Sequence, residues 1–283
     1  MSVDVAIRAG AQLGEGPRWD AAAGRLLWVD IEGRSLHVSD PATEADRAIE
    51  VDNRIGAAAP MADGRVLVAL ADRLAALDLA EESLETLTSF PHGPRLRTND
   101  GACDPRGRFW IGTTELDFAP GQGTLYRYDG DLLPVLTELT LSNGLAWSPA
   151  GTLMYFVDSL TYRVDVFDFD DFPSGRRPFV EIERGEGIPD GLAVDDEGGV
   201  WLALYGGGCV RRYSPVGTLD HVLELPAKNV TACCFGGAGL RDLYVTSAAP
   251  DGHVYVAETA VTGPPAQPFH STAPSDADAT SRR

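Results

Sequence analysis

Gly107-Arg-Phe-Trp-Ile-Gly-Thr113 joins a glycine turn to a short apolar run that ends in small or polar residues. Five other segments share the pattern, and in chain order the six are Gly24–Asp30, Gly64–Leu70, Gly107–Thr113, Gly151–Asp158, Gly199–Leu204 and Leu240–Thr246. Successive starts are 40, 43, 44, 48 and 41 residues apart, close to the roughly 40 to 50 residues of a four-stranded propeller blade. The sequence therefore predicts an all-β chain folded as a six-bladed β-propeller.

The segments between these units are also strand-like. Thr124–Asp129, Tyr162–Asp168 and Cys209–Tyr213 alternate apolar and polar residues, as half-buried strands do. Leu74–Leu84 has helical spacing in places, but the repeat favours a strand there. We expect one propeller domain over residues 1–270 and a disordered, polar tail over residues 271–283.

Composition excludes several classes of partner. The 283 residues carry a formal net charge of −19, which repels nucleic-acid phosphates and anionic lipid surfaces. The chain has no apolar run near the roughly 20 residues of a membrane helix, and its start lacks the features of a signal peptide. We expect a cytoplasmic protein, monomeric or weakly homo-oligomeric, that binds neither nucleic acid nor membrane.

Cysteine and tryptophan have structural interpretations. The four cysteines lack paired C-x-x-C spacing, which predicts buried free thiols. The five tryptophans recur near the repeated strands and are expected to pack in the core. They are Trp19, Trp28, Trp110, Trp147 and Trp201.

At one position of the repeat, five residues before each turn, four of the six units carry a residue of a type that can bind a metal ion through oxygen. The position holds, in order, Glu15, Ala58, Asn99, Asn143, Asp190 and Thr231. Equivalent positions of a propeller face one central channel, so the side chains would converge. Their oxygens suit Ca²⁺, Mg²⁺ or Mn²⁺, and carboxylates leave Zn²⁺ and Fe²⁺ open. The alternative is that the Asn-Gly and Asp-Gly pairs are only turn dipeptides.

Other catalytic signatures are missing from the sequence. The five histidines show no H-E-x-x-H spacing, and there is neither a G-x-S-x-G elbow nor a Walker loop. Histidine zinc sites, serine triads and P-loop nucleotide sites are therefore excluded.

Several short motifs, in this order and spacing, resemble the SMP-30/gluconolactonase/regucalcin family of six-bladed propellers. They are Leu13–Pro17, Arg97–Gly101, Gly107–Thr113, Ser142–Gly144, Val157–Ser159, Val164–Asp170, Pro189–Gly191 and Thr246–Ser247. The resemblance implies one divalent cation in the central channel and hydrolysis of sugar lactones to aldonic acids. It implies Glu15, Asn143 and Asp190 as metal ligands, with Asn99 and Arg97 contacting substrate.

Two questions about the substrate residues stay open. The resemblance implies an acidic substrate contact after Thr113, and either Glu115 or Asp117 could provide it. Arg97 has a second interpretation as a structural counter-charge to the carboxylates.

The leading hypothesis is a metal-dependent lactonase in which Asp190, or a water held by it, is the general base. Aldonolactones of five- and six-carbon sugars are the expected substrates, gluconolactone first. One alternative is a regucalcin-like calcium-binding propeller without dedicated catalysis. Another is a related propeller hydrolase of other esters or organophosphates, for which a channel histidine would be expected. The polar set beyond the metal ligands favours the enzyme.

Overall fold

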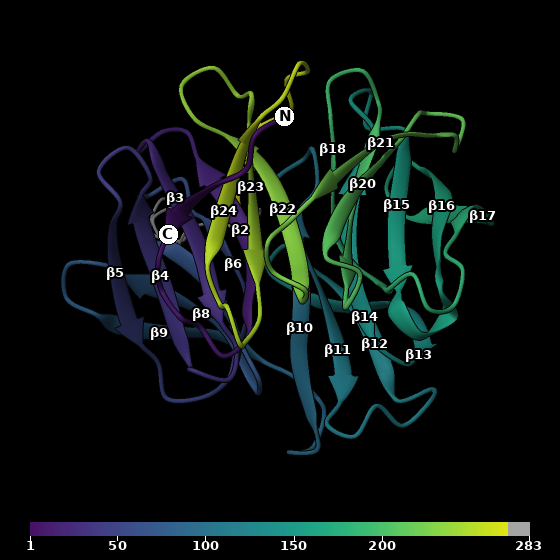
Figure 1. The fold of residues 1–283 in the computed structure, drawn as a ribbon. Coiled ribbons are helices and arrows are strands. Elements are labelled where there is room, and N and C mark those ends of the chain that lie inside the picture. The colour runs from purple at the N-terminus through teal and green to yellow at the C-terminus, as the bar shows by residue number, and fades with distance from the viewer. Residues whose placement is uncertain (271–283) are drawn as a thin grey trace, which may run out of the picture.

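The computed structural model describes residues 1–270, which form six four-stranded antiparallel sheets (Figure 1). The sheets are the blades of a six-bladed β-propeller, so the predicted fold class is confirmed. The tail predicted over residues 271–283 lies outside the described residues. Within residues 1–270 the one helix is the 3₁₀ turn η1 (Ser159–Thr161), and no helix there is long and apolar enough to cross a membrane.

Each blade contributes one strand to each of four concentric layers. The innermost strands are β2 (Gly14–Asp20), β6 (Ile55–Pro60), β10 (Leu96–Cys103), β14 (Ser142–Trp147), β18 (Ile188–Val194) and β22 (Val230–Gly236). The second strands are β3 (Arg25–Asp30), β7 (Val66–Leu70), β11 (Phe109–Glu115), β15 (Leu153–Asp158), β19 (Val200–Tyr205) and β23 (Asp242–Ser247). These second strands coincide with the six repeated segments of the sequence.

The two outer layers come from the segments between the repeats. The third strands are β4 (Ser35–Asp40), β8 (Arg73–Asp78), β12 (Gly123–Tyr128), β16 (Arg163–Phe169), β20 (Cys209–Tyr213) and β24 (Val254–Glu258). The outermost strands are β5 (Ala45–Glu50), β9 (Ser83–Ser89), β13 (Leu132–Leu139), β17 (Pro173–Glu181), β21 (Leu219–Glu224) and β1 (Asp4–Ile7). The preference for a strand over a helix at Leu74–Leu84 is confirmed by β8 and β9.

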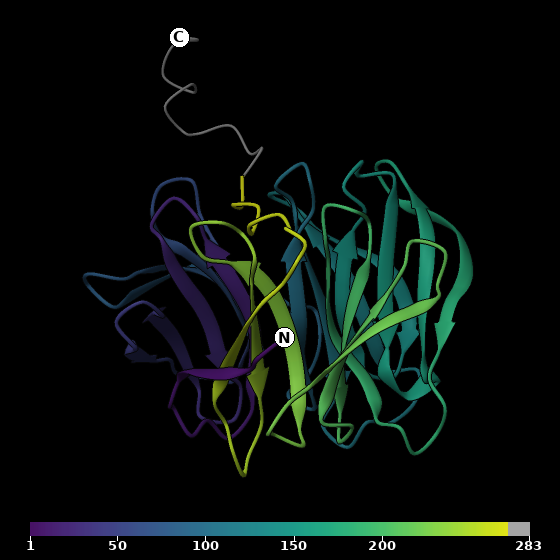
Figure 2. The ribbon, with the colours of Figure 1, turned by 45° about the horizontal axis from the view of Figure 1, so that its top comes forward.

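The ring of blades is closed by the N-terminal strand. β1 pairs antiparallel with β24 and so becomes the outermost strand of the sixth blade. Figure 2 shows this purple strand beside the yellow end of the chain. Each innermost strand also contacts the innermost strands of both neighbouring blades, β22 and β2 included. The six innermost strands therefore surround one central channel.

The hydrophobic core is divided among the six interfaces between blades. Each interface holds its own cluster of buried side chains, for example Leu27 and Val29 against Val66 and Val68 between blades one and two. The other five clusters repeat this arrangement around the ring. All five tryptophans are buried and all four cysteines are free, as predicted. Cys209, Cys233 and Cys234 are also buried as predicted, whereas Cys103 is only half-buried.

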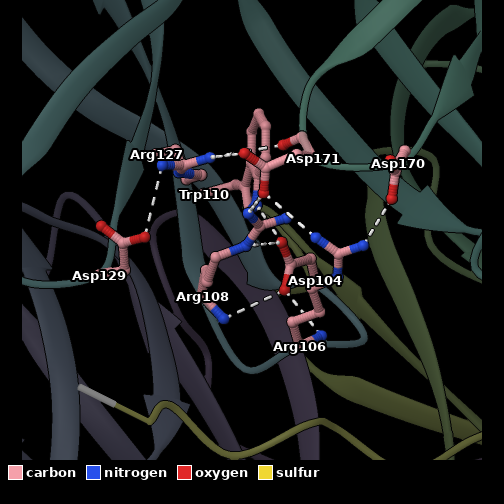
Figure 3. Close-up of polar contacts among 8 residues, drawn as sticks. All are labelled: Asp104, Arg106, Arg108, Trp110, Arg127, Asp129, Asp170 and Asp171. Atoms are coloured by element: carbon pink, nitrogen blue, oxygen red, sulfur yellow. Dashed lines mark hydrogen bonds and ion pairs between the residues drawn. The ribbon is translucent and has the colours of Figure 1, made fainter. Parts of the chain in front are cut away.

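A polar cluster reinforces the interface between blades three and four (Figure 3). Asp104 is fully buried; its carboxylate accepts hydrogen bonds from Arg108 Nε at 2.7 Å and from Trp110 Nε1 at 2.9 Å. Asp171, in the β16–β17 turn, forms ion pairs with Arg106, Arg108 and Arg127 of blade three. These contacts tie the turn of one blade to the strands of the next.

Residues 259–270, after β24, form a segment that we call the C-terminal strap. Its backbone is bonded to blade five through Asp196, to blade one through Trp19, to blade two through Pro60 and to blade three through Gly107. These partners lie at or beside the ends of the innermost strands and their following turns. The strap therefore runs across one mouth of the channel.

Candidate metal and substrate site in the central channel

Each innermost strand carries a β-bulge near the position that the repeat singled out, and in blade one the bulge directly follows Glu15, which still pairs with Val29. Pairing with the second strand is interrupted at Gly16-Pro17, Asn99-Asp100, Asn143-Gly144 and Asp190-Gly191, and at Gly56 and Thr231 in the other two blades. A bulge frees residues from the ladder and redirects their side chains, and bulges concentrate beside active sites. The sequence pattern thus marks a structural irregularity shared by all six blades.

The Asn-Gly and Asp-Gly pairs are not turns, so that interpretation of them is wrong. Both lie inside innermost strands, and their glycines are required by close packing. A Cβ on Gly144 would lie 2.6 Å from the Asp190 carbonyl oxygen, and one on Gly191 would lie 2.4 Å from the Ala232 Cβ. Glycine therefore lets neighbouring innermost strands approach closely at the level of the site.

The register predicted for blade two is also wrong. Its turn begins at Met61 rather than Asp63, because Met61 makes the pair of backbone hydrogen bonds that Asp104 makes in blade three. The equivalent position is therefore Gly56, whereas Ala58 packs in the core between blades one and two. We call the corrected set the polar ring: Glu15, Gly56, Asn99, Asn143, Asp190 and Thr231.

Three carboxyl groups are buried together at this level. Glu15 is 5% exposed, Asp100 is 3% exposed and Asp190 is 6% exposed. Burial and the repulsion of Asp100 raise the pKa of Glu15 to about 8. Burial, followed by repulsion from Glu15 and Asp100, raises the pKa of Asp190 well above its usual value. Mutual repulsion of this kind requires that the three groups lie close together.

Two oxygens of the polar ring lack a hydrogen-bond donor among the described residues. The Asn143 Nδ2 donates to Ser159 Oγ at 3.1 Å, while its buried Oδ1 has no partner. The buried Oδ1 of Asp190 also has none. Unsatisfied buried acceptors are costly unless a ligand supplies the missing interaction. Two free oxygens beside repelling carboxyl groups fit a divalent cation with oxygen ligands.

Residues 1–270 hold no cluster of three or more His, Cys, Asp or Glu side chains placed to bind a metal. The polar ring differs from such a cluster because it pairs two carboxylates with an amide oxygen. Glu15, Asn143 and Asp190 are the residues that could hold the cation, and their assignment stays a prediction.

Arg97 lies buried beside these groups and, within residues 1–270, forms no ion pair with a carboxylate. Its Nη1 donates to Asn99 Oδ1 at 2.7 Å and to the Thr98 carbonyl oxygen at 2.9 Å. The side chain is nine-tenths buried, and burial lowers its pKa against the longer-range attraction of Glu32 and Glu15. Asn99 is held in turn, because its Nδ2 donates to the Ser142 carbonyl oxygen at 2.8 Å. Arg97 and Asn99 therefore form one oriented pair beside the polar ring.

Asp100 and Arg18 are part of the site, and the sequence analysis missed them. Arg18 Nη2 lies 3.1 Å from Asp100 Oδ1, and the same nitrogen donates to the Gly101 carbonyl oxygen at 2.8 Å. The repeat contained a signal that points to Asp100. The position after the polar ring holds glycine or alanine in five blades and Asp100 in the third. An acid at a position that close packing keeps small indicates a specific role.

The two acids that the sequence left open, Glu115 and Asp117, have different surroundings in the structure. Glu115 is buried, and its Oε2 accepts the N–H groups of Asp117 at 2.6 Å and of Ala119 at 3.3 Å. The side chain of Asp117 is 81% exposed and pairs with Arg95. Among the described residues neither acid bonds to the polar ring. Glu115 holds the loop after β11, whereas Asp117 lies on its surface.

Comparison with known proteins identifies the family. The family model of the SMP-30/gluconolactonase/LRE-like region matches residues 13–249. The chain is 36% identical over 245 residues to "Putative sugar lactone lactonase YvrE" of Bacillus subtilis (strain 168), covering 84% of each protein. It is 35% identical over 256 residues to regucalcin of Danio rerio, covering 88% of this chain and 87% of that one.

A solved structure also supports the family assignment. The calcium-binding protein regucalcin from Agrobacterium tumefaciens superposes with a TM-score of 0.91 at 29% identity, covering 95% of this chain and 97% of that one. Fold, motifs and sequence identity over most of the chain point the same way: the protein belongs to the SMP-30/gluconolactonase/LRE-like family.

Proposed function

We propose that this protein is a divalent-metal-dependent hydrolase that opens a sugar lactone to its aldonic acid. The observation that carries the proposal is the buried Arg97, which forms no ion pair with a carboxylate among residues 1–270 and is held with Asn99 beside the polar ring. A guanidinium desolvated next to an acidic site and left without an ion-pair partner is suited to bind oxygens of a substrate. The name of the Bacillus subtilis relative supports the same reaction class.

The cation would be held by Glu15, Asn143 and Asp190. When bound, it would supply Lewis-acid polarisation of the lactone carbonyl. The oxygen donors favour Ca²⁺, Mg²⁺ or Mn²⁺, and Zn²⁺ or Fe²⁺ remain compatible with two carboxylates. The two unpartnered oxygens, Asn143 Oδ1 and Asp190 Oδ1, support this assignment.

Side chains of this chain would orient the sugar. Arg97 and Asn99 would hold hydroxyl groups, which fixes the carbonyl carbon relative to the attacking water. Asp117, exposed on the loop after β11, is the better candidate for a further hydroxyl contact, because both oxygens of Glu115 are engaged in its own loop and in Arg95.

Asp190 would be the general base. The oxygen of its carboxylate that does not bind the cation would accept a proton from the water that adds to the carbonyl carbon, and such a role is worth roughly 10² to 10⁴ in rate. Addition of water forms the new C–O bond, and cleavage of the ring C–O bond releases a hydroxyl group. The proton held by Asp190 returns to that leaving oxygen, and the product is the open-chain acid.

A cation-binding protein without dedicated catalysis is the second candidate, and the regucalcin relatives favour it. It would need Glu15, Asn143 and Asp190 but not the Arg97–Asn99 pair. Hydrolysis of other esters or organophosphates has less support, because none of the five histidines belongs to the polar ring.

The test is proton release near pH 7 from a panel of aldono-1,4- and 1,5-lactones. Metal-stripped protein would be reloaded with Ca²⁺, Mg²⁺, Mn²⁺, Zn²⁺ or Fe²⁺ separately, and spontaneous opening would be subtracted. Turnover that depends on the cation and disappears in Asp190→Ala is the expected result. Tight cation binding with no turnover on any lactone would favour the second candidate.

A further inference from the structure

The position two residues before the polar ring, toward the channel mouth opposite the C-terminal strap, carries arginine in only two blades. In chain order it holds Leu13, Arg54, Arg97, Leu141, Ile188 and Asn229. The two arginines belong to neighbouring blades whose innermost strands pack closely, because a Cβ on Gly56 would lie 2.4 Å from the Asn99 carbonyl oxygen. Arg54 and Arg97 therefore begin from neighbouring positions at the same level of the channel.

The two arginines differ in their partners. Arg97 Nη2 and Nε make no hydrogen bond among the described residues, and neither nitrogen is fully buried, so both can donate to a ligand. Arg54 Nε instead donates to both carboxylate oxygens of Glu32, at 3.0 and 2.9 Å. One arginine is thus free to bind a ligand, whereas the charge of the other is neutralised.

Glu32 reaches Arg54 from the next blade. It lies in the β3–β4 turn of blade one, directly after Ile31, whose N–H donates to the carbonyl oxygen of Leu13. This bond places the turn at the mouth where the innermost strands begin. The side chains of Glu32 and Arg54 are 38% and 34% exposed. The ion pair therefore stands at the entrance to the site and not in the core.

Both members of this ion pair act on Arg97. Burial lowers the pKa of Arg97; among the charges that act on it, the attraction of Glu32 comes first, ahead of that of Glu15, and Arg54 repels it. Such effects are appreciable only over short distances, because water and salt screen charges that lie farther apart. Glu32, Arg54 and Arg97 therefore share one part of the mouth, contributed by blades one, two and three.

This arrangement limits the charge of a ligand. Two free guanidinium groups side by side would suit a carboxylate or a phosphate. Glu32 prevents this, since it engages Arg54 and presents its own negative charge to any anionic group that approaches Arg97. Arg97 Nη2 and Nε remain suited to the oxygens of an uncharged molecule, such as hydroxyl groups.

We propose that Glu32 makes the site selective for uncharged lactones over lactones that carry a carboxylate or phosphate group. It does so by neutralising Arg54 and by repelling a negative substituent beside Arg97. The inference rests on the proposed lactonase function and adds a specificity-determining residue outside the polar ring. Glu32 is not a catalytic residue, because it acts through Arg54 and through its charge.

The test compares kcat/KM for two lactones with the same ring, the uncharged glucono-1,5-lactone and the anionic 6-phosphoglucono-1,5-lactone, after subtraction of spontaneous opening. In Glu32→Gln the preference for the anionic lactone over the uncharged one should rise about tenfold or more. Added salt should reduce this gain, because screening weakens the attraction. The ratio of two rates from one sample does not depend on the fraction of protein that is folded, so a merely structural role would not change it.

Two variants serve as controls. Glu32→Asp keeps the negative charge and should stay near the wild-type ratio. Glu82→Gln removes the acid of a comparable ion pair, in which Arg47 Nη2 lies 2.6 Å from Glu82 Oε1 on the outer surface of blades one and two. Its ratio should equal that of the wild type, because this pair lies away from the channel.

The outcomes separate the two proposals. An unchanged ratio in Glu32→Gln, or a wild-type protein that already prefers the phosphorylated lactone, would overturn the role of Glu32 and leave the lactonase function intact. A wild-type protein that opens neither lactone, nor any other of the panel, would overturn the lactonase function and this inference with it. Should Glu32→Gln fail to fold, Arg54→Met decides: it leaves Glu32 unpaired, so the preference for the anionic lactone should fall, and a rise would refute the proposal.

Discussion

Arg18 Nη2 lies 3.1 Å from Asp100 Oδ1, so a buried ion pair joins blade one to blade three across 82 residues of sequence. The pair separates two parts of the channel. Asp100 repels the carboxyl groups of Glu15 and Asp190 on one side, and Arg18 lines a mostly apolar cavity of about 240 Å³ on the other.

Breaking this pair should destabilise the protein strongly. Asp100→Asn leaves the Arg18 charge buried without a partner, and such losses cost about 3 to 5 kcal/mol. Urea unfolding should show a free energy of unfolding reduced by about that amount. The double variant Arg18→Gln/Asp100→Asn should recover part of it; a double variant less stable than the single one would contradict a buried-charge explanation.

Cation binding should release protons near neutral pH. The pKa of Glu15 is raised to about 8 in the cation-free protein, so its carboxyl group is largely protonated at pH 7 and must lose its proton to bind. Affinity should therefore rise with pH up to about 8. Calorimetry at pH 7 in two buffers of different ionisation enthalpy measures the number of protons released. Glu15→Gln is the control, in which fewer protons should be released.

The same shift fixes the sign of the pH dependence of stability. A carboxyl group whose pKa rises from 4.5 to about 8 on folding binds more protons in the native state. The cation-free protein should thus lose stability as the pH rises from about 4.5 to 8. Thermal unfolding should show this loss, and saturating cation should remove it. A cation-free protein that gains stability over that range would refute the burial of Glu15.

Arg97→Met should separate substrate binding from cation binding. Hydrogen bonds to a charged group are worth about 1.5 to 3 kcal/mol, so KM for a lactone should rise roughly 10- to 100-fold. Cation affinity should hold or increase, because a positive charge near Glu15 and Asp190 is removed. Arg47→Met, at an exposed position, is the control. An unchanged KM with lower stability would make Arg97 a structural counter-charge.

Glu115 and Asp117 should differ in what their loss affects. Glu115→Gln should lower stability, because its carboxylate holds the N–H groups of Asp117 and Ala119. Asp117→Asn should change the free energy of unfolding by no more than about 1 kcal/mol, since the side chain is exposed. It should raise KM by an amount that varies among sugar lactones. Measuring unfolding and kinetics for both variants decides; a KM effect confined to Glu115→Gln would reverse the assignment.

Two acids of the cluster in Figure 3 should contribute unequally to stability. Asp104 is fully buried and bonds to Arg108 and Trp110, so Asp104→Ala should cost about 3 to 5 kcal/mol. The side chain of Asp171 is 52% exposed, and Asp171→Ala should cost about 1 kcal/mol or less. Chemical denaturation measures the free energy of unfolding of both variants. Similar losses in the two would show that the geometry of the interface, rather than the burial of each acid, determines how much these ion pairs stabilise the protein.

Much of the fold could be predicted from the sequence because each blade repeats one local pattern. A glycine turn followed by an apolar strand recurs every 40 to 48 residues, and strand formation and blade length follow from that pattern. The same register located Glu15, Asn99, Asn143 and Asp190, since equivalent positions of a propeller share one channel. It failed in blade two, where Asp63 resembles the turn residue of other blades but Met61 occupies its place.

The sequence by itself determined the number of blades, the position of the polar ring along five of the six innermost strands and the oxygen chemistry of that ring, because these depend on local patterns. Only the tertiary structure decided that the Asn-Gly and Asp-Gly pairs are bulges, that Arg18 meets Asp100, that Arg97 forms no ion pair with a carboxylate among residues 1–270 and that Glu32 engages Arg54. These are relations between blades, set by how closely innermost strands approach and how far each side chain reaches, and no segment of the chain contains them alone.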